Sequence, residues 1–396
     1  MHNLTKIKIF RALLWLTYPI ATVIILPFAL IRRKKSSSLF FFLDRYAIGG
    51  AQRVYLDILE SVSDIQKTVF FTRKSADSKL KDQFYQFSST ECRDIHFWCD
   101  NLFFRLFSVH YFAFYVNRHR SARVLSSNST FFYDMLPFLD RSVVRIELLH
   151  NFSYGKKGME FFGLANHKYL DLRMVIDEFT KQNIISQYRE FGIDHKYDER
   201  VIVSEYGVDI PTAVTKTEIP PLKILYAGRG THQKRVWLLN RVAEYFIEKK
   251  LPVEFTFAGP LDNDLSDFVK KNCRVLGGVG EQNRMRELFA DHHVIILVSA
   301  FEGFPVVVKE GMSYGCVPVV TGLPGNKIHL THLSNALLID NMDNEDKVVL
   351  NAIQCIELLL ADKELLKNLS KNAYEYVQKK FGKQDFLTTY RKLLID

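Results

Sequence analysis

The part of the chain with the clearest chemistry is a turn and helix that carry two carboxylates, Glu302 and Glu310. Residues 298–320 read Val-Ser-Ala-Phe-Glu-Gly-Phe-Pro-Val-Val-Val-Lys-Glu-Gly-Met-Ser-Tyr-Gly-Cys-Val-Pro-Val-Val, a pattern of strand, turn, helix, glycine stop and strand. The first N–H groups of a helix have no partners within it, so the start at Gly303-Phe304-Pro305 suits phosphate or sugar oxygens. Two lone glutamates would more often be solvated surface side chains. The whole passage predicts a ligand site to which both carboxylates point.

A basic loop is the second candidate. Residues 228–235 read Gly-Arg-Gly-Thr-His-Gln-Lys-Arg and follow an expected strand. A diphosphate leaving group carries concentrated negative charge, and cations aimed at it stabilise the departing oxygen. Arg229 and Lys234 are placed to do this. The alternative is that Lys234 and Arg235 only begin a solvated helix.

Two further candidates lie in the first half of the chain. Gly49 and Gly50 are adjacent after an expected strand, and two glycines let the backbone approach a phosphate or an acceptor closely. Without other support, such a pair indicates only a turn. His150 ends the expected strand Val143–Leu149, where a structural and a functional role are both open.

The Glu302–Glu310 passage resembles the E-x7-E motif of the family-four retaining glycosyltransferases, which have the GT-B fold. The flanking matches are Ser299, Gly303-Phe304-Pro305, Met312, Gly315 and Pro318-Val319-Val320. The resemblance implies that Glu310 binds the ribose of a nucleotide and that Glu302 contacts the donor sugar. We expect a nucleotide sugar, linked to UDP, GDP or ADP, as co-substrate and no metal or other cofactor.

The other candidates match motifs of the same family, with three departures. Arg229 and Lys234 fall on the basic positions of its Gly-Arg…Lys-Gly element, Gly49-Gly50 falls on its Gly-Gly-Ala-Glu-Arg loop, and His150 resembles a histidine that reaches the donor sugar. Here Gln52 replaces Glu, Tyr206 replaces Asn before Gly-Val-Asp, and Arg235 replaces Gly. Arg235 would either narrow the phosphate pocket or add a third cation. The implied catalytic residues are Glu302, His150, Lys234 and Arg229, and the implied donor-binding residues are Gly49, Gly50, Arg229, Lys234, Glu302, Gly303, Phe304, Pro305 and Glu310.

The elements that position these residues follow an α/β pattern. Short apolar runs alternate with amphipathic stretches from residue 38 onwards, as is typical of open parallel sheets. The expected strands are Ser38–Leu43, Thr68–Phe71, Val143–Leu149, Met174–Ile176, Leu222–Ala227, Val253–Ala258, Val294–Val298 and Val317–Val320. Helical spacing recurs near 345–360, 362–380 and 384–394. We therefore predict a GT-B-like architecture of two doubly wound, Rossmann-like domains that face a cleft.

Prolines and composition suggest the domain limits. Residues 212–221 are poor in large apolar side chains and are bracketed by Pro211 and Pro220-Pro221, as in an interdomain linker. The expected parts are a membrane-associated segment over 1–36, an acceptor domain over 37–210, a linker over 211–221, a donor domain over 222–380, and a C-terminal helix over 381–396 that could return to the first domain.

The N-terminal segment has the composition of a membrane element. Ala12–Ile31 contains 20 residues without a charge, about the length needed to cross a bilayer core of roughly 30 Å. Pro19 and Pro27 weaken the case for a straight spanning helix. Spanning or re-entrant insertion, in-plane association and a buried core helix remain open. The cluster Arg32-Arg33-Lys34-Lys35 favours the cytoplasmic face of the cell (inner) membrane for the residues after it.

A second stretch could also contact lipid. Residues 103–123 combine seven aromatic side chains with four arginines and contain no acidic residue. Such a helix could dock on an anionic membrane beside the N-terminal segment. The alternative is that the aromatic stripe packs in the core.

Charge and cysteine content limit the other functions. The formal net charge is +9, of which residues 1–35 hold +7, so only +2 remains for the other 361 residues. A nucleic-acid partner is therefore not expected. The five cysteines are scattered and form no C-x-x-C pair, so neither a disulfide framework nor a zinc site is indicated.

These expectations combine into one function and one alternative. The resemblance implies a retaining glycosyltransferase that moves a sugar from a nucleotide-diphosphate sugar to a membrane-associated acceptor, such as a lipid-linked glycan, lipopolysaccharide or exopolysaccharide precursor. Its partners would be the nucleotide sugar, a glycan or glycolipid acceptor and membrane lipid. The alternative, suggested by the departures at Gln52, Tyr206 and Arg235, is a catalytically inactive scaffold or partner subunit with the same fold.

Overall fold

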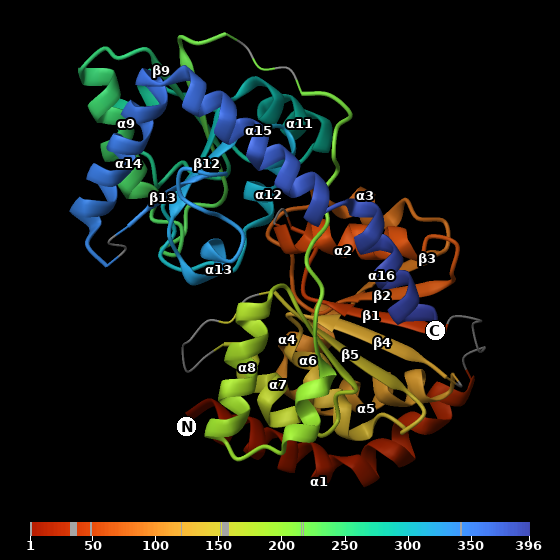
Figure 1. The fold of residues 1–396 in the computed structure, drawn as a ribbon. Coiled ribbons are helices and arrows are strands. Elements are labelled where there is room, and N and C mark those ends of the chain that lie inside the picture. Colours follow the sequence, from red (N-terminus) through yellow and green to blue (C-terminus); the bar gives the residue numbers. More distant parts are fainter. Residues whose placement is uncertain are drawn as a thin grey trace. The chain divides into compact units, whose positions relative to one another are not determined.

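The chain folds into two compact α/β units. The computed structural model describes residues 2–31, 38–47, 50–119, 121–150, 152, 158–214, 216, 218–340 and 343–396. Unit 1 contains Met1–Glu205 and Leu387–Asp396, and unit 2 contains Tyr206–Phe386 (Figure 1). Each unit has its own parallel sheet.

The sheet of unit 1 has seven parallel strands in the order β3-β2-β1-β4-β5-β6-β7. The strands are β1 (Leu39–Leu43), β2 (Lys67–Phe71), β3 (Thr90–Asp94), β4 (Arg123–Ser127), β5 (Val144–Leu149), β6 (Leu172–Val175) and β7 (Val201–Val203). The strand order changes direction between β1 and β4. Ligands of such sheets bind outside the carboxyl ends of the strands at this switch point.

Helices cover the sheet of unit 1. They are α1 (His2–Ile31), α2 (Gly50–Ser61), α3 (Lys81–Tyr85), α4 (His96–Asp100), α5 (Leu102–Asn117), α6 (Thr130–Met135), α7 (Glu160–Asn166) and α8 (Glu178–Glu190), with 3-10 turns at Leu136–Phe138 and His195–Arg200. Asn101 begins α5 by accepting hydrogen bonds from Phe103 N and Phe104 N, which satisfies donors that have no partner within the helix. The α5 side chains then pack on Phe42 and Phe70 of the sheet.

The sheet of unit 2 has six strands in the order β10-β9-β8-β11-β12-β13. They are β8 (Leu222–Ala227), β9 (Val253–Ala258), β10 (Arg274–Val275), β11 (Val294–Leu297), β12 (Val317–Thr321) and β13 (Leu337–Ile339). All are paired in parallel. The strand order changes direction between β8 and β11, which places a second switch point there.

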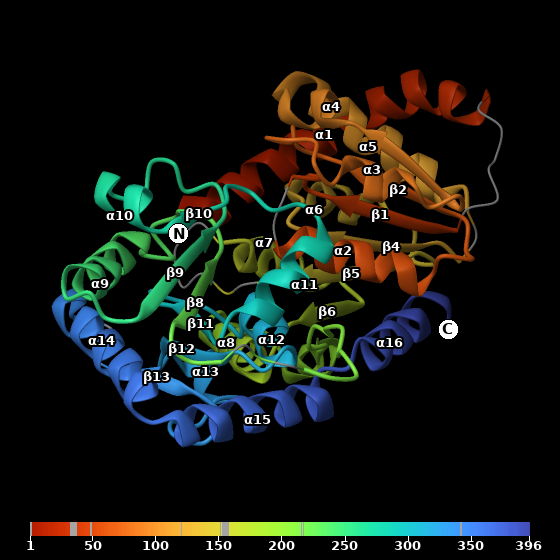
Figure 2. The ribbon, with the colours of Figure 1, turned by 90° about the horizontal axis from the view of Figure 1, so that it is seen from above.

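Helices cover both faces of this sheet too. They are α9 (Val236–Glu248), α10 (Asp267–Asn272), α11 (Gln282–Asp291), α12 (Val306–Ser313), α13 (Pro324–Lys327), α14 (Glu345–Ala361) and α15 (Lys363–Lys380). One core lies under α9, α14 and α15, and a smaller one lies under α11 on the other face (Figure 2). Side chains alternate between the two cores, since Tyr226 joins the first and Leu225 the second.

The chain passes between the units twice. Val208 forms a parallel bridge with Gly382, so the two crossing segments lie side by side within unit 2. Tyr206 is buried there and packs edge-on against Phe386, with ring centroids 6.2 Å apart. The last helix, α16 (Lys383–Ile395), begins in unit 2 and ends in unit 1. Near its end, Arg391 forms an ion pair of 2.6 Å with Asp64.

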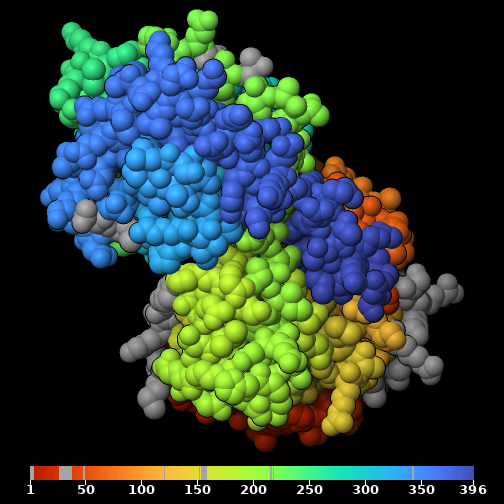
Figure 3. Space-filling view, in the orientation of Figure 1, coloured from red at the N-terminus to blue at the C-terminus, as the bar shows by residue number. Residues whose placement is uncertain are grey.

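Helix α1 lies along α5 and α7 at the surface of unit 1 (Figure 3). Its inner face buries Leu14 and Ala21, and Arg11 donates to Asn166 Oδ1 at 2.7 Å. Its outer face exposes large apolar side chains: Ile9, Leu13, Leu16, Ile20, Val23 and Ile24. The stretch Leu4–Ile25 is long and apolar enough to cross a membrane by length and composition. The side chains of 26–31 and the basic cluster at 32–35 lie outside the described residues.

The α/β prediction is confirmed by the two parallel sheets. Every expected strand overlaps an observed one, and the limits of β8 and β9 are as predicted. Most of the aromatic stripe of 103–123 packs in the core through α5, as the alternative stated, with Phe112 and Tyr115 buried. The first turn of α5 is open, with Leu102 and Phe103 62% and 66% exposed.

Candidate functional site

The two motif loops of unit 2 follow neighbouring strands at the switch point of its sheet. Arg229 and Lys234 lie between β8 and α9, and Glu302 lies between β11 and α12. Since β8 and β11 are parallel neighbours, their carboxyl ends are at the same edge. The fold therefore brings together two passages that are far apart in the sequence.

Several bonds join these two loops. Lys234 Nζ forms an ion pair with Glu302 Oε1. Ala300 N donates to the carbonyl oxygen of Gln233 at 2.8 Å, and Gln233 Nε2 donates to the carbonyl oxygen of Phe301 at 2.8 Å. The Lys234 side chain is 18% exposed to solvent, and the Glu302 side chain is 8% exposed. A preformed cation and carboxylate thus stand at the edge where ligands of such sheets bind.

Arg235 stabilises the same turn from within. Its φ of 50° lies in the left-handed region, which glycine adopts at lower cost than other residues. The side chain is only 5% exposed; Nε donates to Val298 O at 2.7 Å and Nη2 to Ser299 O at 3.1 Å. Burial lowers the pKa of its guanidinium. Arg235 thus makes backbone contacts in the turn, and the two roles expected from the sequence, a narrowed pocket or a third cation, stay predictions.

Arg229 is exposed directly after β8. Tyr226, buried beneath it, donates its hydroxyl to the carbonyl oxygen of Arg229 at 2.9 Å. Burial, together with the charge of Glu302, raises the pKa of Tyr226. The loops are also packed tightly: a Cβ on Gly259, whose φ is +150°, would lie 1.8 Å from Gly228 O. The Tyr226 hydroxyl and the close packing of Gly259 on Gly228 therefore fix the main chain that carries Arg229.

The turn Gly303-Phe304-Pro305 leads into α12. Phe304 is turned into the protein, where it stacks on His329 with ring centroids 4.5 Å apart, and Pro305 is buried as well. A Cβ on Gly325 would lie 2.5 Å from Gly303 O, so the next loop lies directly against this turn. A ligand at this turn could meet backbone atoms, whereas the Phe304 ring forms part of the core.

Glu310 is half-buried on α12, at the fifth position of the helix. The pKa of Arg286 on α11 is raised by its hydrogen bond with Asp209 and by the charge of Asp209, with a smaller contribution from the charge of Glu310. Arg286 Nη2 lies 2.6 Å from Asp209 Oδ2. Glu302 and Glu310 thus belong to the same connection between β11 and β12, and Glu310 has a basic neighbour on α11.

The candidates of the first half of the chain are in unit 1. Gly49 lies outside the described residues, and Gly50 begins α2. His150 directly follows β5 and is buried, which lowers its pKa to about 3. Its ring centroid is 5.3 Å from that of Tyr55 on α2. The grouping of Gly49, Gly50 and His150 with the unit 2 residues stays a prediction.

A polar cluster at the switch point of unit 1 was not predicted. Asp44 follows β1, and burial raises its pKa. The hydroxyl oxygen of Tyr55 lies 3.4 Å from Asp44 Oδ1 and 3.1 Å from Ser127 Oγ, either of which can accept its proton. Gln52 Nε2 donates to Asp44 Oδ1 at 3.3 Å, a bond that glutamate could not make when ionised. The sequence signal was available, since a polar residue follows each of two adjacent strands, but β4 was not recognised as a strand.

No group of side chains that could hold a metal ion is found within the described ranges. The adjacent histidines His292 and His293 have separate structural partners. His292 contacts Thr256 Oγ1 at 2.8 Å, and His293 Nδ1 accepts a hydrogen bond from Lys223 N at 3.0 Å.

Two Rossmann-like units of this kind define the GT-B fold class, and comparison with solved structures agrees. HepE from Anabaena, in complex with UDP-glucose, aligns with a TM-score of 0.67 at 16% identity over 90% of this chain and 99% of that one. A glycosyltransferase from Rickettsia africae aligns with a TM-score of 0.67 at 13% identity over 91% and 100%. The lipopolysaccharide outer core galactosyltransferase WaaB aligns with a TM-score of 0.62 at 17% identity over 89% and 98%. At these identities the likeness shows the fold.

A family model matches the second unit. Residues 212–376 match the model of the glycosyl transferases group 1 family. The glycogen synthase of Aquifex aeolicus is 37% identical over 101 residues, 24% of this chain and 21% of that protein. An uncharacterized glycosyltransferase of Methanocaldococcus jannaschii is 24% identical over 164 residues, 38% and 40% of the two chains. The chain therefore matches well under half the length of either relative.

Proposed function

We propose that this protein is a glycosyltransferase that uses a nucleotide-diphosphate sugar. The observation that carries the proposal is the Lys234–Glu302 pair on two joined loops, at the switch point of a glycosyl transferases group 1 domain. HepE, which shares the fold, is described with UDP and with UDP-glucose, which supports a nucleotide sugar as the ligand class.

Each donor residue has a chemical task in this proposal. Arg229 and Lys234 neutralise the diphosphate as the sugar leaves, because cations fixed near developing negative charge lower the barrier without reorganising. Glu310 accepts hydrogen bonds from the ribose hydroxyls, and Glu302 contacts the sugar while it holds Lys234 in position. Backbone N–H groups at the start of α12 add donors for oxygen atoms. No metal ion is needed, since Arg229 and Lys234 supply the positive charge.

Sugar transfer in this proposal retains the anomeric configuration. Two carboxylates beside a glycosidic bond would suggest a double displacement, but Glu310 is assigned to ribose and Glu302 is paired with Lys234, so neither serves as nucleophile. Instead, the acceptor hydroxyl attacks the anomeric carbon from the face the nucleotide leaves. The C–O bond to the acceptor forms as the bond to the diphosphate breaks, and the acceptor proton passes to the departing phosphate oxygen.

Unit 1 binds the acceptor in this proposal, with His150 and the Gly49-Gly50 loop reaching the donor sugar. The acceptor is a membrane-associated glycan or glycolipid at the cytoplasmic face. The long apolar helix α1 and the basic residues around it in the sequence support this. The departures that favoured an inactive scaffold have structural explanations: Gln52 binds Asp44, Tyr206 packs on Phe386, and Arg235 supports the turn.

Nucleotide binding gives the first test. A ligand that binds the native state raises the apparent melting temperature, so UDP, GDP or ADP should stabilise the wild-type protein. The same nucleotide should stabilise Lys234→Ala much less. Lys223→Ala is the matched control, because Lys223 lies at the opposite end of β8 and is also ion-paired, to Asp291 at 2.6 Å. A protein that no nucleotide stabilises would count against the proposal.

A further inference from the structure

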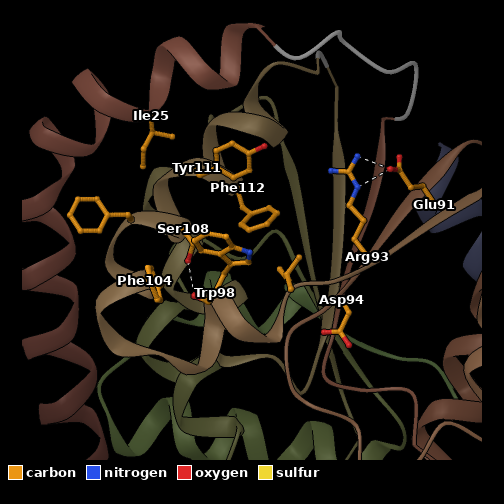
Figure 4. Close-up of a pocket in the computed structure, with 11 residues that line it drawn as sticks. Ile25, Glu91, Arg93, Asp94, Trp98, Phe104, Ser108, Tyr111 and Phe112 are labelled. Carbon is orange, nitrogen blue, oxygen red and sulfur yellow. Dashed lines mark hydrogen bonds and ion pairs between the residues drawn. The ribbon is translucent and has the colours of Figure 1, made fainter.

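Unit 1 contains an apolar cavity far from the donor motif in sequence. Its volume is about 740 Å³, within the range of roughly 300–1,000 Å³ typical of small-molecule sites. Helices α1, α4 and α5 and the edge strand β3 enclose it (Figure 4). Its apolar wall is formed by Ile25, Ile95, Trp98, Phe104, Phe107 and Phe112.

The opposite side of the cavity is polar and belongs to β3. Glu91, Arg93 and Asp94 line it, with side chains 32%, 26% and 29% exposed. Arg93 is paired with Glu91 at 2.6 Å, and its guanidinium lies 5.6 Å from the centroid of the Tyr115 ring. Arg93 is thus paired within the rim, and Asp94 adds a carboxylate that accepts a hydrogen bond from His96 N at 3.2 Å and contacts His96 Nδ1 at 2.6 Å. Such a rim suits hydroxyl groups, which donate hydrogen bonds to carboxylates, and disfavours a phosphate.

The apolar wall continues onto exposed apolar surface. On α1, Ile25 lines the cavity while its neighbour Ile24 is 53% exposed. On α4, Trp98 lines the cavity and is still 48% exposed, and Phe97 beside it is 57% exposed. Exposed apolar side chains gathered beside a cavity are typical of an interaction site. The cavity and the outer face of α1 share one helix, so a chain could pass from one to the other.

We propose that this cavity binds the hydrocarbon chain of a membrane lipid whose head group is uncharged and carries hydroxyl groups. The chain lies against the aromatic wall, and the head group meets the β3 rim. Helix α1 has a stretch, Leu4–Ile25, that is long and apolar enough to cross a membrane, and Lys6 and Lys8 are exposed near its start. A bilayer surface supplies hydrocarbon chains at this position, which favours lipid over a soluble apolar ligand.

The position of the rim connects this site with the proposed acceptor domain. Asp94 accepts a hydrogen bond from Tyr46 OH at 3.4 Å, and Tyr46 follows β1 by three residues. The head group would therefore emerge at the carboxyl-end edge of the sheet, where Asp44 lies at the switch point. The assignment of this cavity to the lipid chain of the acceptor rests on the proposed function. Lipid binding in the cavity can be tested without a nucleotide sugar.

Tryptophan fluorescence allows a direct test. The chain has three tryptophans, and Trp15→Phe with Trp237→Phe leaves Trp98 as the reporter in the cavity wall. Dodecyl glucoside with a bromine at the chain end, used below its micelle concentration, should quench Trp98. Affinity for glucosides from octyl to dodecyl should rise roughly fourfold for each added methylene. Quenching in a variant that retains only Trp15, without quenching of Trp98, would place the chain on the outer face of α1 and overturn the proposal.

Two neighbouring substitutions on α1 supply the control. Ile25→Lys puts a charge into the cavity wall and should weaken glucoside binding roughly tenfold or more, since burying a charge is unfavourable. Ile24→Lys makes the same change on the exposed side and should leave binding unchanged. Equal effects of both, or tighter binding of dodecyl phosphate than of dodecyl glucoside, would contradict the proposal. If Ile25→Lys lowers the melting temperature of the protein, the proposal is judged by the quenching of Trp98 and by the chain-length series, both measured without this variant. Nucleotide stabilisation without Trp98 quenching would remove this site and leave the proposed function standing.

Discussion

The switch points of the two sheets have the same topology and opposite chemistry. In unit 2, the loops after β8 and β11 carry the cation of Lys234 and the carboxylate of Glu302 as an ion pair that retains some exposure. In unit 1, the ends of β1, β4 and β5 carry a buried cluster in which the pKa of Asp44 is raised and that of His150 is lowered, both by burial. Both shifts favour the uncharged form.

The difference indicates which ligand each switch point suits. Preformed charge stabilises a diphosphate and the charge that grows on it as a bond breaks. Buried groups whose charged forms are disfavoured suit hydroxyl groups, which can both donate and accept hydrogen bonds. The contrast supports a division in which unit 2 binds the nucleotide and unit 1 binds a neutral, hydroxyl-bearing acceptor. Changes at each switch point should therefore have different consequences.

The largest effect is expected from removing the cation of unit 2. Lys234→Ala should lower kcat/KM for the nucleotide sugar by roughly 10²–10³-fold, as expected for loss of one preorganised electrostatic group. Steady-state kinetics on the wild type and on Lys223→Ala, which should keep normal activity, provide the reference. Comparable rates for Lys234→Ala and wild type would remove the functional contrast between the two units.

Glu310 should act on nucleotide binding more than on the chemical step. Glu310→Ala removes a charged acceptor for ribose hydroxyls and should raise the Kd of the nucleotide by roughly 10–100-fold, the usual value of a hydrogen bond to a charged group. Calorimetric titration measures the change. The same substitution at Glu345, an exposed residue in the first turn of α14, should leave the Kd as it is.

The lowered pKa of the buried His150 predicts a loss of stability in acid. Because the pKa of His150 is about 3 in the folded chain and about 6.5 in an unfolded one, only the unfolded state binds a proton as the pH falls below about 6.5. Its contribution to the free energy of unfolding should therefore fall by about 2 kcal/mol between pH 7.5 and pH 5.

Urea unfolding at these two pH values tests this prediction. His150→Asn should reduce the difference between them, and the exposed His195→Asn serves as the background. Burial also lowers the pKa of His110 and of His292 to about 4. These histidines contribute to the pH dependence of the free energy of unfolding, but the change caused by His150→Asn does not include their contribution. An identical pH dependence for His150→Asn and wild type would show that His150 is not held uncharged.

The smallest effect is expected at Arg235. Arg235→Gly should leave nucleotide affinity unchanged, since the guanidinium donates to the backbone carbonyls of Val298 and Ser299. Arg235→Ala should be less stable than Arg235→Gly by about 1 kcal/mol, because alanine still has to adopt the left-handed conformation. Thermal unfolding and nucleotide titration of both variants measure this. A loss of affinity as large as that of Lys234→Ala would make Arg235 a third phosphate cation.

The sequence predicted apolar strands well and missed a strand that ends in polar residues. Continuous apolar runs identified β8 and β9 with their limits, since a strand buried on both faces contains few polar residues. Strand β4 was missed because its last residues are serines. Ser126 donates to Phe42 O at 2.8 Å and Ser127 to Leu148 O at 2.9 Å, so these hydroxyls are satisfied by neighbouring strands, which a sequence alone does not reveal.

The sequence also indicates part of the candidate site. The charged residues of unit 2 stand in recognisable motifs, and the fold brings Lys234 and Glu302 together. The buried cluster of unit 1 depends on contacts between Asp44, Tyr55 and Ser127, which are up to 83 positions apart, and no motif marks it. The role of Arg235 also required the structure, because its partners are backbone carbonyls on another loop.

The most direct test of the proposed function is nucleotide release. Purified protein is incubated with UDP-, GDP- and ADP-linked sugars in the presence of membrane lipid extract, and the released nucleotide is measured for the wild type and for Lys234→Ala. We expect release from at least one donor by the wild type, and strongly reduced release by Lys234→Ala. Equal release by both proteins, or none from any donor by the folded wild type, would contradict the proposed function.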